Sequence, residues 1–295
     1  MIIELEDGRK LGVDLAVKVT MRYDLTPIPS TVEAVIRANE AVYAAIKNGA
    51  IIKVGSDGDR YRVLKVKMVS GSGVVGRSEP IQAMQITAML EDCFPLAYMR
   101  QRAIIKEKTT FGEVYRACGC TAKVKDDIQV ERFSCFVGGV GTYGVALSMQ
   151  EAAAVPIWRD SALTFMRVKE AMKQAPVASV PLDLTTEIES EFIERHEIPA
   201  FLSVDEGGGF VYGKRDSVRR VAYTPRKSES TLRNMSTALV NRRIYNGQLD
   251  ASIRAGDVFK VGGQAHIVVT AVHSRSGGDG APAESSRFWL ATLEG

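Results

Sequence analysis

Two stretches in the first third of the chain alternate apolar and polar residues, at positions 11–23 (LGVDLAVKVTMRY) and 61–69 (YRVLKVKMV). Successive side chains of a strand point to opposite faces, so this period of two predicts strands that are buried on one face. Between them, residues 30–49 (STVEAVIRANEAVYAAIKNG) show helical spacing, with Ser30 placed to cap the start and Gly49 to end it. The first third is therefore predicted to be a β-barrel-like unit with one helix.

The pattern changes near residue 88, where short helical and strand patterns begin to alternate. Turn signals separate each pattern from the next, which is typical of a compact α+β unit. The predicted elements are helices at 109–119 and 144–154, strands at 121–125 and 132–137, and a pair of strands within 155–168 that turns at 159–162.

A short segment, residues 175–181 (APVASVP), is predicted to link this unit to a third one. Strand patterns then return, with turns at 207–209 and 262–263 and a glycine-rich loop at 274–287. The predicted fold class is therefore mainly β with an α+β insertion. The predicted domains are a first β-barrel-like unit at 1–87, an α+β unit at 88–174 and a second β-barrel-like unit at 175–295.

One short pattern occurs in both β-rich parts of the chain. Residues 49–67 (GAIIKVGSDGDRYRVLKVK) and 256–272 (GDVFKVGGQAHIVVTAV) both read glycine, two residues, an apolar residue, Lys-Val-Gly, a turn and an alternating strand. Their two-residue difference in length falls inside the turn, so the side-chain alternation is kept on both strands. The pattern predicts two related β units in one chain. A chance likeness between two valine-rich hairpins is the alternative.

Composition is that of a folded protein without a strong charge bias. The 295 residues are 45% apolar, enough for two or three domain cores, and 38 basic against 35 acidic side chains leave a net charge of +3. This balance argues against a general attraction to nucleic acid or membranes. Residues 1–10 are acidic where a signal peptide is basic, and no apolar run has membrane-spanning length. We expect a soluble product made in the cytoplasm.

A glycine pattern known from dinucleotide-binding loops lies in the middle unit. Gly139, Gly141 and Gly144 form a literal G-x-G-x-x-G between a strand and a helix pattern, and Asp160 follows about 20 residues later, as a ribose-binding acid would. Such a site needs a second parallel strand and a further crossover helix, whereas the strand that reaches Asp160 turns straight back. A turn that packs a helix on a hairpin is therefore favoured, and a nicotinamide or flavin oxidoreductase is the alternative.

All four cysteines also lie in the middle unit, at Cys93, Cys118, Cys120 and Cys135. Four thiolates can hold zinc or an iron–sulfur cluster, and Cys118 and Cys120 are close enough to bind one metal ion. No C-x-x-C pair occurs and Cys135 falls in an apolar strand pattern, so buried free thiols are favoured. We therefore predict no cofactor, with a metal site on these cysteines as the alternative.

The remaining charged residues show no catalytic arrangement. His196 lies in a glutamate-rich stretch that is typical of a solvated face, and His266 and His273 are spaced to point to opposite faces of one strand. Basic residues interleaved with tyrosines at 212–233 are compatible with DNA contact, although salt bridges at a subunit interface are favoured. No catalytic residue is predicted, and the protein is predicted not to be an enzyme.

The segment from Gly144 to Val168 (GVALSMQEAAAVPIWRDSALTFMRV) resembles part of a known family. A helix ending in a small or acidic run, an aromatic strand, an Arg-Asp turn and a return strand are similar to an element of phage tail baseplate hub proteins and of the base of type VI secretion spikes. The preceding TFGEVYRACGCTAKV and the late RAGDVFKVGGQAHIVVTAVHS resemble further elements of that family. The resemblance implies two related tail-tube-like β-barrels separated by α/β material.

The resemblance also implies a structural hub or tail-tip protein without a catalytic motif. Three copies would form a ring whose six β units face a six-fold tail tube, while a three-fold spike docks below. It implies tube, spike and other baseplate proteins as partners, DNA or tape-measure protein in the channel, and a place in the virion after assembly in the host cytoplasm. Exposed strand edges pair readily. The edges expected to meet neighbouring subunits carry Val63, Lys65, Lys67, Val69, Ile267, Val268, Val269 and Val272.

Overall fold

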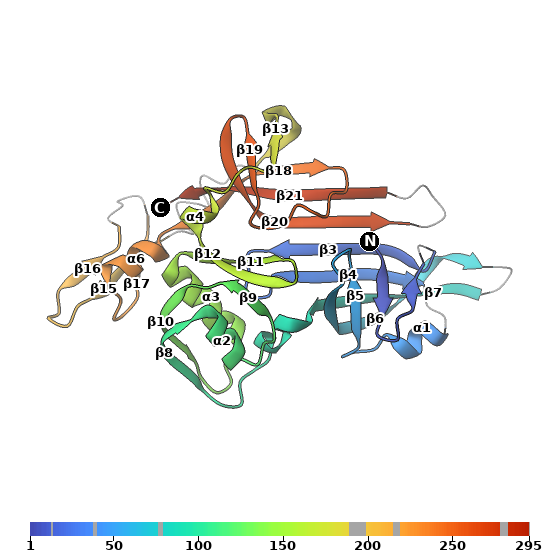
Figure 1. Cartoon of the computed structure of the whole chain (residues 1–295), viewed down its shortest axis with the longest axis horizontal. Helices are drawn as coiled ribbons and strands as arrows, with labels where there is room; N and C mark the ends of the chain where they lie inside the picture. Colours follow the sequence, from blue (N-terminus) through green and yellow to red (C-terminus); the bar gives the residue numbers. More distant parts are fainter. Residues whose placement is uncertain are drawn as a thin grey trace.

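The computed structural model describes residues 1–12, 14–37, 40–75, 79–188, 199–214, 219–277 and 283–294, with the backbone alone described over 70–75 and 79–82. Strands dominate it (Figure 1). One sheet of 13 strands crosses both β-rich parts of the chain, and three small sheets accompany it. The predicted fold class, mainly β with an α+β insertion, is confirmed.

The first β unit is built from residues 3–90. Its strands are antiparallel in the order β3-β4-β7-β6-β5-β1-β2. Val19, Met21 and Tyr23 of β3 are buried at alternate positions, as the sequence pattern predicts. The elements are β1 (Ile3–Leu5), β2 (Lys10–Leu11), β3 (Ala16–Asp24), β4 (Ser30–Arg37), α1 (Glu40–Ala45), β5 (Ile51–Val54), β6 (Asp59–Val75) and β7 (Glu79–Leu90).

The helix predicted over residues 30–49 is wrong in its first half. Ser30, Val32, Ala34 and Ile36 are buried at alternate positions of β4, which lies between β3 and β7. Ser30 caps no helix, because its hydroxyl lies 2.8 Å from the hydroxyl of Tyr61 inside the sheet. The same residues satisfy a period of two as well as a helical period, and pairing with two neighbouring strands decides for the strand. Only α1 remains helical.

The second β unit combines two segments, residues 178–187 and 238–294. The predicted linker at 175–181 contributes a strand, β13, which runs parallel to β19. The predicted loop at 274–287 is shorter than expected, because the flanking strands extend into it. The elements are β13 (Ala178–Val180), η2 (Leu182–Leu184), β14 (Thr185–Glu187), β18 (Ala238–Gly247), β19 (Val258–Val261), β20 (Gln264–Ser276) and β21 (Ala283–Glu294).

The two β units repeat one strand order, although β1 runs antiparallel to β5 whereas β13 runs parallel to β19. Strand order is β3-β4-β7-β6-β5-β1 in the first and β14-β18-β21-β20-β19-β13 in the second. The strands also follow one another along the chain in the same way, so that β4, β5, β6 and β7 correspond to β18, β19, β20 and β21. Gly49 N–H donates to the Val63 carbonyl at 2.8 Å, and Gly256 N–H donates to the Val268 carbonyl at 2.8 Å. Both glycines have left-handed φ angles, +88° and +97°. The sequence repeat is therefore a structural repeat. Within the described residues neither unit closes into a barrel, because the strands form an open path from β2 to β14.

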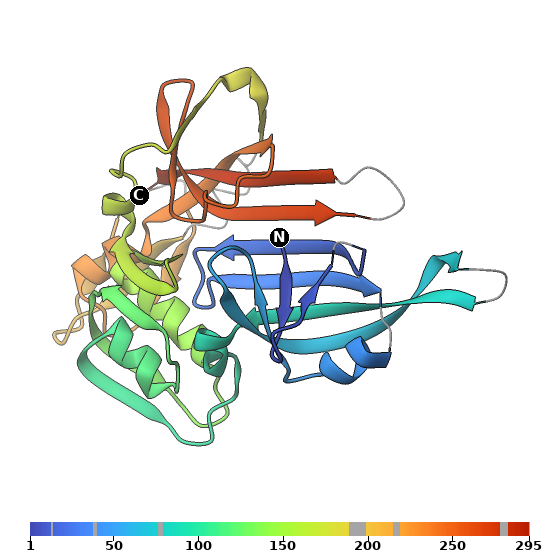
Figure 2. The same cartoon turned by 45° about the vertical axis from the view of Figure 1, so that its right-hand side comes forward.

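The middle unit packs against both β units (Figure 2). Its hairpin turns at Asp160 and Ser161, both with positive φ angles, where the sequence predicts a turn. Three elements were not predicted: a 3₁₀ helix at 91–97, a strand at 104–110 and a short helix at 168–171. The elements are η1 (Glu91–Ala97), β8 (Ile104–Thr110), α2 (Phe111–Ala117), β9 (Lys123–Asp126), β10 (Gln129–Cys135), α3 (Gly141–Ala152), β11 (Ala154–Arg159), β12 (Ala162–Arg167) and α4 (Val168–Ala171).

A small sheet interrupts the second β unit and packs on the middle unit. Asn234 Nδ2 donates to the Glu151 carbonyl at 3.0 Å, and Gln150 Nε2 donates to the Met235 carbonyl at 3.4 Å, which joins α6 to α3. This sheet and its helix protrude at one end of the molecule in Figure 1. The elements are β15 (Ala200–Val204), β16 (Phe210–Tyr212), β17 (Val221–Tyr223) and α6 (Glu229–Met235).

Candidate assembly interface

The two β units meet along one antiparallel strand pair, which we call the seam: residues Lys18–Asp24 of β3 against Thr270–Ser276 of β20. Figure 2 shows β20 running beside β3. Thr270 Oγ1 donates to Asp24 Oδ1 at 2.6 Å, and the hydroxyls of Thr20 and Ser274 lie 3.2 Å apart. The seam therefore joins the two units through backbone and side-chain hydrogen bonds.

His273 is fully buried at the seam. Its Nε2 lies 2.9 Å from the Ile253 carbonyl, which can only accept a hydrogen bond, so Nε2 carries the proton and Nδ1 accepts from Ser286 Oγ at 2.8 Å. The ring meets the edge of Tyr23 with centroids 5.9 Å apart. Burial lowers the pKa of His273 to about 4, so the imidazole is neutral at neutral pH.

The hairpin of the middle unit is fastened to both β units. The buried carboxylate of Asp59 accepts from Trp158 Nε1 at 2.9 Å and from Ser161 Oγ at 2.7 Å. On the other side, Arg159 pairs with the buried Asp257 at 2.6 Å. These contacts fix the position of the α+β insertion relative to the seam, and the sequence alone did not identify them as a group.

The predicted interface residues of β20 have partners on both strand edges within the chain. Ile267 lies opposite Val258 and Ala291, and Val272 lies opposite Arg22 and Arg287. The backbone of Val268 bonds to β19-side residues and the carbonyl of Val269 accepts from Leu25 N–H at 3.2 Å. Ile267, Val268, Val269 and Val272 therefore have no free edge, and their expected pairing with a neighbouring subunit is replaced by pairing inside the chain.

The predicted interface residues of β6 have a different environment. Val63 bonds to Ala50 beside β5, but from Lys65 to Val69 the described strands pair only with β7. Lys65 and Lys67 are exposed, and Met68 is 48% exposed. This stretch is an open strand edge, and edge-to-edge contact through Lys65, Lys67 and Val69 remains a prediction.

A second open edge lies on β14, which the sequence analysis missed. Thr185, Thr186 and Glu187 pair with β18 on one side, and no other described strand lies on their second side. Glu187 is 71% exposed and forms an ion pair with Arg243 at 3.5 Å. A strand of three residues carries almost no periodic signal, so only its place beside β18 reveals it.

The glycine motif belongs to a packed turn. A Cβ added to Gly141 would lie 3.0 Å from Leu96 Cδ2, and one added to Gly144 would lie 3.0 Å from the Phe133 ring. One on Gly139 would meet the Phe136 carbonyl at 3.0 Å. The space above these glycines is therefore occupied by the protein itself, where a dinucleotide loop would face a pyrophosphate.

The topology around the motif also differs from a dinucleotide-binding unit. β10 before the loop pairs antiparallel with β8, whereas β11 after α3 lies in another sheet and forms a hairpin with β12. Asp160 sits in that hairpin turn, 70% exposed, and pairs with Lys125 at 2.8 Å. β10 and β11, the strands on either side of α3, therefore lie in different sheets and form no parallel β-α-β unit, and the parallel pair of the middle unit is β9 with β12.

The four cysteines are free and buried in the core of the middle unit. Burial raises the pKa of three of these thiols, to about 11 for Cys118, to about 12 for Cys120, and well above its ordinary value for Cys93. Within the described ranges, no three His, Cys, Asp or Glu side chains gather in a metal-binding arrangement. A protonated thiol is a poor ligand and a poor nucleophile.

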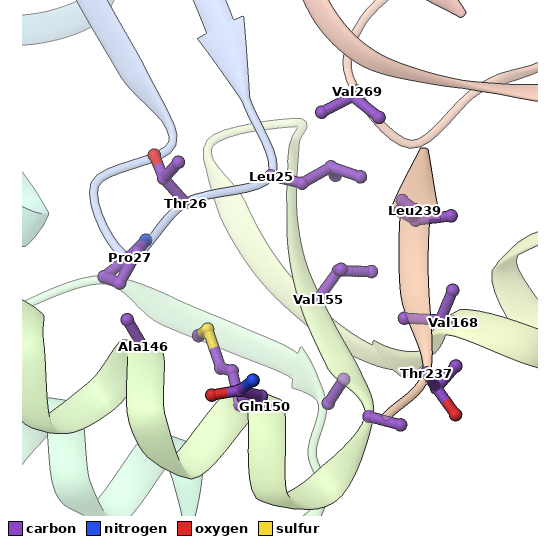
Figure 3. A pocket seen from close by; sticks show the side chains of 13 residues that line it. Leu25, Thr26, Pro27, Ala146, Gln150, Val155, Val168, Thr237, Leu239 and Val269 are labelled. Atoms are coloured by element: carbon purple, nitrogen blue, oxygen red, sulfur yellow. The ribbon is translucent and has the colours of Figure 1, made fainter. Parts of the chain in front are cut away.

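An apolar pocket of about 320 Å³ lies where all three parts of the chain meet (Figure 3). Leu25 comes from the turn after β3, Met149 from α3, and Leu239 and Val269 from the second β unit. None of its lining residues is titratable, so the pocket holds no acid–base group. Its walls are the junction of the three packed units.

Large apolar side chains are exposed around the glycine turn. Met99 is 71% exposed, Phe136 64% and Tyr143 76%. The two segments that carry them bond to each other, since Arg100 N–H donates to the Gly139 carbonyl at 2.8 Å and Met99 bridges Val140. Exposed apolar groups gathered on one surface are typical of contact sites between proteins.

The basic stretch near the small sheet forms ion pairs within the chain. Lys227 pairs with Glu151 at 2.6 Å, which ties the small sheet to α3, and Arg233 pairs with Glu229 one helical turn away. His196 and its glutamate-rich stretch, and Arg215, lie outside the described residues. Among the described residues, no helix combines the length and apolar character needed to cross a bilayer.

Comparison with known proteins finds likeness in structure. No protein-family model matches the sequence, and no curated protein matches it. The fold is similar to a tail protein of Neisseria meningitidis MC58, with 10% identity, 99% of this chain and 95% of that chain covered, and a TM-score of 0.65. The 43 kDa tail protein of prophage MuSo2 from Shewanella oneidensis is similar at 11% identity, with 98% and 96% covered and a TM-score of 0.62.

A third likeness reaches a secretion system. A component of the type VI secretion system of Escherichia coli, itself described as similar to the bacteriophage T4 tail proteins gp27 and gp5, matches at 10% identity. The match covers 99% of this chain and 77% of that chain, with a TM-score of 0.56. The resemblance to phage tail and type VI spike proteins is therefore confirmed at the level of the fold.

Proposed function

We propose that this chain is a structural subunit of a bacteriophage tail, placed at the baseplate hub or tail tip, where copies join into a ring. The fold is that of tail proteins over nearly the whole chain. The observation that carries the proposal is the duplicated β unit, since a ring of such chains presents twice as many β units as it has copies.

Symmetry gives the duplication a purpose. A ring of three copies presents six related β units to a six-fold tail tube and keeps a three-fold face for a spike. Closed assemblies must match the symmetry of the structures they bind, and a repeated unit within one chain resolves a mismatch of six against three. The open edges of β6 and β14 are the surfaces through which such a ring would close.

The partners and location follow from this role. The subunit would contact tail tube, spike and other baseplate proteins, and its ring would surround part of the channel through which DNA, and transiently the tape-measure protein, passes. The ring would be assembled in the host cytoplasm and remain in the virion. Likeness to tail proteins supports this placement.

The role is structural and non-enzymatic. The glycines that could have held a dinucleotide face Leu96 and Phe133, and the cysteines that could have held a metal are buried core residues. His273 is used in the seam. Within the described residues, the motif glycines, the cysteines and His273 therefore have packing or hydrogen-bonding roles.

Sedimentation and negative-stain microscopy of the purified chain test the proposal. We expect rings of three copies with six similar outer lobes, in equilibrium with monomer at low concentration. A chain that stays monomeric at high concentration would overturn it. Added nicotinamide and flavin nucleotides should leave the thermal midpoint unchanged, because a ligand stabilises a protein only if it binds the folded state.

A further inference from the structure

One open edge lies in each β unit, on β6 in the first and on β14 in the second. We propose that β6 of one copy pairs antiparallel with β14 of the next copy, with Val69 opposite Thr186 and Met68 opposite Glu187. This inference rests on the ring proposed above and specifies the strands and the register that close it. The seam between β3 and β20 is the template, because it joins a first and a second unit within one chain.

The equivalence of β6 and β20 starts from two valines. Val63 N–H donates to the Ala50 carbonyl at 2.9 Å, and Val268 N–H donates to the Asp257 carbonyl at 2.8 Å. Directly after each valine, the register with the next strand, β7 or β21, slips by one residue. The shared hydrogen bond and the shared bulge align the rest of the strands. The resulting pairs are Lys65 with Thr270, Val66 with Ala271, Met68 with His273 and Val69 with Ser274.

The equivalence of β3 and β14 follows through the neighbouring strands. Ala34 of β4 lies opposite Ile86, and Tyr245 of β18 lies opposite Phe288. Val63 pairs with Ala88 of β7, and Val268 pairs with Leu290 of β21. Ile86 and Phe288 each lie two residues before these partners, so they are equivalent. Ala34 and Tyr245, which lie opposite them, are therefore equivalent as well. Their partners on the other side are then equivalent too. The pairs are Val19 with Thr185, Thr20 with Thr186, and Met21 with Glu187.

The register between copies is read from the seam by substitution. Thr20 lies opposite Ser274 in the seam, and Met21 lies opposite His273. Thr186 takes the place of Thr20 and Val69 that of Ser274, so Thr186 lies opposite Val69. In the same way, Glu187 replaces Met21 and Met68 replaces His273, so Glu187 lies opposite Met68. The proposed pairing is antiparallel, like the seam.

The direction of backbone groups provides an independent check of this register. Val66 N–H points away from β7, since it donates to Asn48 Oδ1 at 3.1 Å, and Met68 two residues later points the same way. Ile188 N–H donates to a carbonyl of β18 at 2.8 Å, so the N–H of Glu187 points away from β18. The register thus sets two outward-facing residues opposite each other, as a hydrogen-bonded pair requires.

Charge and exposure fit a contact that forms after folding. Lys65 and Lys67 are exposed on β6, and Glu187 is exposed on β14. Lysines on an open edge hinder unselective pairing with other strands. The opposite charges of the two edges favour approach of β6 to β14 over approach of β6 to a second β6.

A disulfide between copies tests the register in the full chain. Val69→Cys and Thr186→Cys would face each other as a non-hydrogen-bonded pair with Cα atoms about 4.5 Å apart, within reach of a disulfide. The four native cysteines are buried and do not compete. The control, Lys65→Cys with Thr186→Cys, keeps the strand face but moves the thiol by about 13 Å.

Mild oxidation followed by a non-reducing gel is the readout. We expect species of three linked chains from the first pair, in at least tenfold excess over the control. Rings that assemble without this link, or equal linking in both pairs, overturn the register and leave the ring proposal standing. A chain that never associates overturns the ring itself. Linked ladders without a closed species support the pairing and overturn closure.

A proline variant tests the same edge without cysteines. Met68→Pro removes an N–H that points outward, so the bonds to β7 are kept, whereas Met68→Thr keeps the N–H as a control. We expect both variants to fold with wild-type circular dichroism, and the proline variant to associate at least tenfold more weakly. Equal association of the two variants would overturn the role of β6.

Discussion

The same strand occurs twice in this molecule, as β6 and as β20, and its two copies have different neighbours. β20 is covered on both edges, by β21 and by β19 and β3, whereas from Lys65 to Val69 the described strands cover β6 on one edge alone. Where β20 has Thr270 and Val272, β6 has Lys65 and Lys67. A strand that is covered as the chain folds can be uncharged, whereas an edge that waits for a partner benefits from charge.

This difference shows how a repeat inside one chain informs assembly. The seam is a contact between a first and a second β unit within one chain. The open edges of β6 and β14 are the surfaces equivalent to the two strands of the seam, and they have no partner among the described strands. In a ring, the in-chain seam and the contact between copies would alternate around the circle. The structure of one chain therefore contains an example of the contact that we expect between chains.

The largest expected effect comes from breaking the seam. Ala271→Pro removes an N–H directed at β3 and should cost about 3 kcal/mol of the free energy of unfolding, because a buried acceptor in the middle of the sheet loses its donor. Val66→Pro, at the equivalent position of β6, removes a bond to the Asn48 side chain alone and should cost well under half as much. Urea unfolding of both variants measures this. Equal losses would contradict the difference between the two edges.

The next effect concerns Asp59, which anchors the hairpin of the middle unit to the first β unit. Asp59→Ala leaves the donors of Trp158 and Ser161 without their acceptor and should lower the free energy of unfolding by about 3 kcal/mol. Its equivalent in the second unit, Gln264, is exposed, and Gln264→Ala should change stability by less than about 0.5 kcal/mol. Thermal and urea unfolding compare the two, and similar losses would sink the assignment of Asp59 as an anchor.

A smaller effect should appear with pH, through His273 of the seam. Its pKa is about 4 in the folded chain and 6.5 ordinarily, so the unfolded chain binds more protons between these values. Stability from this group is complete above pH 6.5 and falls as the pH drops towards 4, by about 2 kcal/mol at pH 5. The control His273→Gln lacks the titration. Urea unfolding of both proteins at pH 7.5 and pH 5 should show the additional loss in wild type, and parallel losses would refute it.

The smallest effect on stability is expected at the open edge. Lys67→Val gives β6 the residue that β20 has at the equivalent position and should change the free energy of unfolding by less than about 0.5 kcal/mol. Without the edge lysine, β6 should pair less selectively with strands of other molecules, so the association of the protein in solution should change. Light scattering of the variant beside Val272→Thr, a matched change on β20, measures this. Unchanged scattering would show that Lys67 does not guard the edge.

Parts of the fold could be predicted because their signal is local. The turn at Asp160 and Ser161 lies between two apolar runs, and the repeat around Gly49 and Gly256 needs left-handed glycines at fixed places. The segment from Ser30 could not be assigned in this way, because its apolar residues satisfy both a helical and a strand period. Pairing with β3 and β7 on both sides selected the strand.

Part of the predicted interface lies on an open strand edge, and contact there with a neighbouring subunit stays a prediction. Lys65 and Lys67 alternate with Val66 and Met68 on an open edge, whereas the mostly apolar residues from Ile267 to Val272 are covered on both edges. Alternation reports which face of a strand is buried, and it carries no information about which edge has a partner. That information depends on residues far away in the sequence, such as Lys18–Asp24.

The sequence by itself determined the β, α+β, β order, the duplicated hairpin and the packed glycine turn, because each follows from side-chain period and turn residues close together in the chain. The resemblance of residues 144–168 to tail proteins pointed to the same fold. Only the tertiary structure decided which edges stay open, that β14 exists, that Asp59 anchors the insertion and that His273 is buried neutral. The physical reason is that strand pairing and burial join residues more than a hundred positions apart, as Thr20 and Ser274 show, and no local pattern encodes such a partner.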